Sequence, residues 1–124
     1  MKMHHIAITV QNIKESIDWY TENLNAEVLF EDKTWGLVSV NGFKIAFVFK
    51  DMHPPHLCFE IDEETKDELS LKYEKEFKAH RDGSEYIYVP DISGNTIEFL
   101  YWPDISVDWH IYNILMRWLC QLKS

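Results

Sequence analysis

The stretches HIAITV (residues 5–10) and HLCFEI (residues 56–61) decide the fold, because each begins with histidine and then alternates large apolar with small or polar residues. Such alternation is typical of a β-strand with one buried face. His5 and His56 are 51 residues apart, and the same offset relates Phe47 to Glu98 in two further strand-like runs. A shared offset in the first and last strands of two segments indicates a duplicated unit.

The first unit continues with a helix and three strands. Asn12 can cap a helix whose apolar residues recur every three or four positions up to Leu24. Strand-like runs follow, and Asn41-Gly42 between the last two is a strong hairpin signal. The pattern predicts a βαβββ module over residues 2–50, with strands at 27–30, 35–40 and 44–49.

The second unit repeats this order after a linker that contains Pro54 and Pro55. An acidic start at Asp62 predicts a helix that runs to about Tyr73. We therefore expect one α+β domain over residues 1–124, built from two tandem βαβββ modules that form a curved mixed sheet around a cavity. The second module spans 54–102, with strands at 56–61, 75–80, 85–89 and 96–101.

The C-terminal segment, residues 107–122, reads as a helix that is apolar around most of its circumference. A helix of this kind needs a surface against which it is buried. We expect it to pack on the sheet and to contribute to a homodimer contact.

Composition restricts the partners and the compartment. A formal net charge of −9 argues against nucleic acid, because a phosphate backbone would be repelled. No apolar run reaches the length that crosses a membrane. Cys58 and Cys120 lie in apolar runs without a disulfide spacing, which is typical of a reducing cytoplasm.

Three stretches, HIAITV, HLCFEI and DISGNTIEF (residues 91–99), resemble the metal-ligand strands of the vicinal oxygen chelate superfamily. The resemblance implies that His5, His56 and Glu98 hold a divalent metal such as Zn, Mn, Ni or Fe. It also implies a homodimer. Many glyoxalases of this superfamily take a fourth ligand from the strand that here carries Phe47, which cannot coordinate a metal.

The same resemblance implies a glyoxalase-like enzyme that acts on a small molecule with adjacent oxygens, as a lyase, isomerase or transferase. Two imidazoles and one carboxylate leave a divalent cation with open positions and net positive charge, which suits a Lewis acid. Two alternatives stay open: a metal-free binding protein similar to bleomycin-resistance proteins, and a ring-cleaving dioxygenase.

The other histidines are predicted to lie outside this site. His4 falls on the opposite face of its strand from His5, and His53 lies in the proline-rich linker. His80 and His110 have no partner at an informative spacing, so we expect both to face solvent.

Aromatic residues on the predicted strands are expected to line the substrate pocket. The segment KEFKAHR (residues 75–81) resembles fosfomycin-resistance thiol transferases, in which the positions of Lys78 and Tyr88 contact an anionic substrate. Tyr88 and Glu98 are the predicted catalytic residues, with Glu60 as another candidate base. The predicted pocket residues are Trp35, Phe47, Phe49, Tyr86, Tyr88 and Tyr101.

Overall fold

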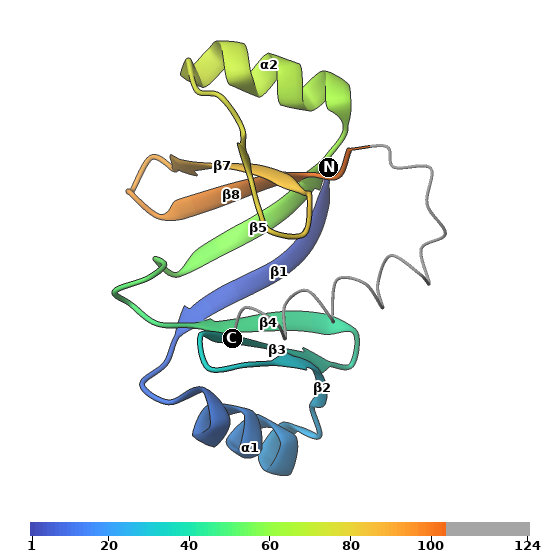
Figure 1. Ribbon diagram of the computed structural model, residues 1–124, viewed down its shortest axis with the longest axis vertical. Helices are drawn as coiled ribbons and strands as arrows, with labels where there is room; N and C mark the ends of the chain where they lie inside the picture. Colours follow the sequence, from blue (N-terminus) through green and yellow to red (C-terminus); the bar gives the residue numbers. More distant parts are fainter. Residues whose placement is uncertain (104–124) are drawn as a thin grey trace. The chain divides into compact units, whose positions relative to one another are not determined.

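The computed structural model describes residues 1–103, so the predicted helix over 107–122 lies outside the described residues. The elements run βαβββ and then βαβββ again, as the sequence predicted (Figure 1). Contacts divide the described chain into two compact units, His4–Leu57 and the remainder from Cys58 onward together with Met1–Met3. The elements are β1 (Lys2–Thr9), α1 (Ile13–Leu24), β2 (Glu27–Glu31), β3 (Trp35–Val40), β4 (Phe43–Val48), β5 (His56–Ile61), α2 (Glu63–Tyr73), β6 (Lys78–Ala79), β7 (Glu85–Pro90) and β8 (Thr96–Tyr101).

Helix α1 begins and ends where the sequence predicts. The side chain of Asn12 accepts a hydrogen bond from the backbone N–H of Glu15, which satisfies one of the unpaired donors at a helix start. Asn25 ends the helix in the left-handed region, with φ 52°. Ile13 and Ile17 are buried, and their side chains lie against Gly36 of β3.

The strands of the first unit lie in the order β2-β3-β4-β1, with β1 parallel to β4 and β3 antiparallel to both of its neighbours. Helix α1 covers one face of these strands, and Val38 and Phe47 pack there against its isoleucines. Gly36 allows this approach, because a Cβ at its position would lie 2.9 Å from the Ile17 side chain. The opposite face is built around Ala7, Ala46 and Val48.

In the second unit the strands lie in the order β5-β8-β7-β6. Asp62 caps α2 through the backbone N–H of Thr65, and the helix contacts β8. The Lys66 ammonium of α2 pairs with Glu85 and lies 4.9 Å from the centre of the Tyr101 ring. These contacts hold α2 against the face of β7 and β8 that carries Glu85 and Tyr101.

The predicted strand at 75–80 is shorter than expected. Glu74 adopts a left-handed conformation with φ 52°, and the N–H of Lys75 is bonded to the Ser70 carbonyl. These residues therefore close the helix end, and only Lys78 and Ala79 remain to pair with β7. Within residues 1–103, no helix has the length and apolar character needed to cross a membrane.

Candidate metal centre

His56 is the first residue of β5, and its ring is held in one orientation. The side chain is buried, with 7% of the residue surface exposed. Its Nδ1 lies 2.8 Å from the carbonyl oxygen of Pro54. A carbonyl oxygen only accepts, so Nδ1 carries the proton and the Nε2 of the neutral ring keeps its lone pair. Histidines that bind metals through Nε2 are commonly fixed by such a bond to the other nitrogen.

His5 of β1 brings a second nitrogen to the same point. Its Nε2 lies 3.4 Å from the Nε2 of His56, with the rings edge to face at 72°. Two imidazole nitrogens that each lie about 2.0–2.1 Å from one tetrahedral zinc ion are roughly 3.3 Å apart. The spacing of His5 and His56 therefore fits a shared cation.

His4 lies closer to this pair than the sequence predicted. Strand alternation places it on the opposite face from His5, yet its Nδ1 is 2.7 Å from the Nδ1 of His5. One of these nitrogens must donate. If His5 donates, its Nε2 is left with a lone pair, as in His56. The expectation that His4 is a surface residue without a role near the site is therefore wrong, and the adjacent histidines of the HH pair were the signal.

Phe47 and Phe49 do not lie on the face of His5. In the parallel pairing of β1 with β4, Ala7 is opposite Ala46 and Ile8 is opposite Phe47. Phe47 is fully buried against α1, where its ring lies 4.9 Å from that of Tyr20, and Phe49 packs on the same cluster. The predicted pocket role is therefore wrong for both phenylalanines.

The offset of 51 misplaced Phe47 because a shift of one residue exchanges the two faces of a strand. The face of β4 that shares the side of His5 presents Lys44, Ala46 and Val48. None of these side chains is an oxygen ligand.

Glu98 is the centre of the polar cluster in the second unit. Only 3% of its surface is exposed, which is rare for a carboxylate unless it has partners. Cys58 of β5 forms a side-chain hydrogen bond with Glu98, and Tyr88 is its cross-strand neighbour on β7. Burial, and then the Glu98 charge, raise the pKa values of the Cys58 thiol and the Tyr88 hydroxyl. Both groups keep their protons at neutral pH.

His80 is a site residue that sequence reasoning missed. Its Nε2 lies 2.9 Å from a Glu98 carboxylate oxygen, and its ring stacks on Tyr86 with centroids 3.9 Å apart. The prediction that His80 simply faces solvent is wrong, since only 31% of its side chain is exposed. No spacing in the sequence pointed to this contact, because β6 and β8 are brought together only through β7.

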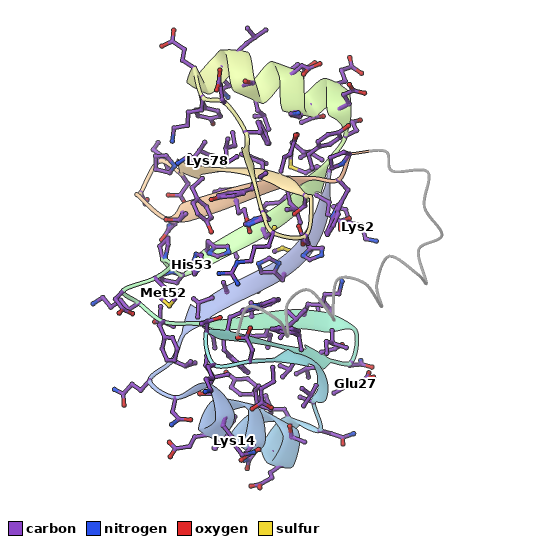
Figure 2. All side chains as sticks on the ribbon, in the orientation of Figure 1. Lys2, Lys14, Glu27, Met52, His53 and Lys78 are labelled. Atoms are coloured by element: carbon purple, nitrogen blue, oxygen red, sulfur yellow. The ribbon has the colours of Figure 1, made fainter. Side chains whose placement is uncertain are left out.

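The remaining predicted pocket residues lie on different faces of their strands. Trp35 lies on the side of β3 that carries Leu37 and faces away from α1, where it stacks on Phe30 at 4.5 Å. Tyr86 and Tyr88 lie on the Glu98 side of the second unit. Tyr101 lies on the α2 side beneath Lys66, so its predicted pocket role is wrong. Lys78 lies on β6, where it is exposed (Figure 2).

The donor chemistry of each unit fits a divalent cation. His5 and His56 offer two imidazole nitrogens at a ligand spacing in the first unit. Glu98 offers a buried carboxylate in the second unit. Nitrogen and oxygen donors of this kind suit zinc, manganese, nickel and iron ions.

Comparison with known proteins gave consistent likenesses. The family model described as Glyoxalase/Bleomycin resistance protein/Dioxygenase superfamily matches residues 2–101. No curated protein sequence gave a match.

Solved structures resemble the fold at low sequence identity. A hypothetical protein from Bacillus halodurans C-125 has a TM-score of 0.66 at 14% identity, covering 86% of this chain and 98% of that one. Methylmalonyl-CoA epimerase from Mycobacterium tuberculosis has a TM-score of 0.65 at 14% identity, covering 82% and 87% respectively. A Mn(II)-bound glyoxalase from Novosphingobium aromaticivorans has a TM-score of 0.61 at 16% identity, covering 81% and 37%.

Proposed function

Because the chain belongs to the glyoxalase/bleomycin resistance protein/dioxygenase superfamily, as its sequence predicted, we propose that it is a metal-dependent enzyme acting on a small molecule with adjacent oxygens. The proposed ligands are His5, His56 and Glu98, and the proposed metal is a divalent Zn, Mn, Ni or Fe ion. The observation that carries the proposal is the 3.4 Å approach of the two imidazole Nε2 atoms.

The continuity of β5 supports Glu98 as the third ligand. His56 and Cys58 are two residues apart on this strand and therefore share one face. Cys58 in turn forms a hydrogen bond with Glu98.

The residues around the proposed ligands have separate roles in this reading. A bound divalent cation would supply Lewis-acid stabilisation of an oxyanion on the substrate, which is worth several kcal/mol in a site with little water. Tyr88 is proposed to donate a hydrogen bond to a substrate oxygen from its protonated hydroxyl. Trp35 and Tyr86 would provide flat apolar contacts. The reaction class is a lyase, isomerase or transferase reaction.

Further proposals concern the partners and the cellular compartment of the protein. We propose a homodimer, because of the apolar segment 107–122 and the family resemblance. The charge and the thiols are the grounds for a cytoplasmic location without a nucleic-acid partner. Since one structural relative is an epimerase of a CoA ester, CoA thioesters with a second carbonyl group belong in a first substrate panel, beside α-ketoaldehydes.

The test is metal content and affinity of the full chain purified without a histidine tag. We expect one equivalent of divalent metal per chain by elemental analysis. His56→Ala and Glu98→Gln should each lower the affinity by more than the roughly 10–100-fold that loss of a supporting hydrogen bond costs. Affinity is measured by competition with a chromophoric chelator.

Two matched variants serve as controls. His53→Ala removes a histidine from the loop between β4 and β5 (Figure 2), and Glu85→Gln neutralises a carboxylate on the α2 side of β7. Both should bind metal like the wild type. A wild-type protein that binds no divalent metal would overturn the proposal and favour a metal-free binding protein instead.

A further inference from the structure

The pair formed by His80 and Glu98 is the most specific polar contact in the second unit that the sequence did not predict. A buried carboxylate must be hydrogen-bonded, because an unsatisfied one costs several kcal/mol. Glu98 meets this need partly through the Nε2 of His80, at 2.9 Å. An ionised carboxylate only accepts, so His80 donates the hydrogen bond and holds its proton on Nε2.

The imidazole of His80 is held in place from two directions. Its ring stacks nearly parallel to that of Tyr86, with 15° between the planes. Its backbone N–H donates to the Ser84 carbonyl at 2.8 Å, and its own carbonyl accepts from the N–H of Gly83 at 3.1 Å. Ser84 is itself fully buried and bonded to Asp82. The tight turn between β6 and β7 thus fixes where the donor nitrogen of His80 lies.

We propose that His80 is the positioning residue for the Glu98 carboxylate. It donates to one carboxylate oxygen and would thereby hold the carboxylate in one orientation for the proposed metal. The inference rests on the proposed function, because it concerns the orientation of a proposed ligand. A carboxylate that hydrogen bonds already hold in one orientation loses less rotational freedom on binding a cation than an unsupported one does.

A purely structural role is the competing explanation. In that case His80 would satisfy a buried charge and contribute to folding, and metal affinity would not depend on it. Thermal stability alone cannot separate the two roles. The test therefore reads metal affinity, with stability measured beside it.

Two substitutions of His80 separate the effect of its N–H donor from the effect of its ring. His80→Phe keeps a flat ring on Tyr86 but removes the donor, and His80→Gln keeps an N–H donor without the ring. We expect His80→Phe to weaken Zn²⁺ and Mn²⁺ affinity by roughly 10–100-fold. His80→Gln should recover most of that loss. His53→Phe, the same exchange in the loop between β4 and β5, should leave the affinity unchanged.

The outcomes distinguish this inference from the proposed function. If the wild type binds metal and His80→Phe binds it equally well, the inference falls and the proposed function stands. A His80→Gln variant as weak as His80→Phe would also overturn it, since the donor would not be the property that matters. A wild-type protein without metal affinity overturns both.

A second measurement reads the wild type itself. ¹⁵N-detected NMR of the metal-free wild type reports which nitrogen of His80 carries the proton. We expect the tautomer protonated on Nε2, with its signal altered in Glu98→Gln. A ring protonated on Nδ1, with Nε2 bare, would overturn the inference.

Discussion

At His56, the Pro54 carbonyl holds the proton on Nδ1, and at His5 the neighbouring His4 is placed to do the same. In His56 the lone pair is then on Nε2, the atom that lies 3.4 Å from the Nε2 of His5. The supporting partners are close in sequence to the rings they hold. The orientation of each ring is therefore set by short stretches of backbone.

Phe47 gives a stability prediction at the residue scale. Its side chain is fully buried between β4 and α1, so Phe47→Ala removes an aromatic ring from the core. We expect a loss of about 3–5 kcal/mol in the free energy of unfolding, measured by urea denaturation. Trp35→Ala, which truncates a half-buried ring away from α1, should cost less. Equal losses in the two variants would contradict the assignment of faces.

The positions of some residues could be predicted from the sequence, and those of others could not. His5 and His56 were found because each starts a strand with the same pattern. His80 could not be found, since its contact with Glu98 depends on the pairing of two strands with a third between them. Phe47 was misplaced by a single step in register, because a repeat offset does not record insertions in turns.

The start of α2 provides a prediction at the scale of an element. Hydrogen bonds from Thr65 to the Asp62 cap lower the pKa of that carboxyl from its ordinary value of 3.8. The unfolded chain therefore binds this proton at a higher pH than the folded chain does. The cap contributes stability above the unfolded pKa and loses it as the pH falls through the folded value.

Asp62→Asn isolates this contribution, because asparagine keeps an oxygen that can cap the helix but does not titrate. We expect the stability advantage of the wild type over Asp62→Asn to shrink as the pH falls from 5 to below 3.8. Urea unfolding of both proteins across this range gives the difference. A stability advantage of the wild type that grows toward acid pH would contradict the predicted direction of the pH dependence.

Elements with a clear start signal were predicted well, and those without one were not. Asn12 marked α1, and Asn41-Gly42 marked the hairpin between β3 and β4. The strand predicted at 75–80 was too long, because the residues after Tyr73 are taken up by the helix end. Nothing in their side chains distinguishes this closing turn from a strand.

The state of association is a prediction for the whole molecule. We expect the full chain to be a homodimer, with the predicted helix over 107–122, outside the described residues, contributing apolar contact area. Multi-angle light scattering at micromolar concentration gives the mass directly. A value matching the 14.8 kDa of one chain would contradict the prediction.

The spacing of the two imidazole nitrogens has a consequence for which ion the proposed site would hold. A pair of imidazole nitrogens 3.4 Å apart would accommodate several first-row divalent cations, whose intrinsic affinities rise from manganese to copper and fall again at zinc. The occupant of such a site is then decided by which ions are abundant where the chain folds. Protein produced in media with different trace-metal supplements should differ in metal content, and catalytic assays need the ion defined first.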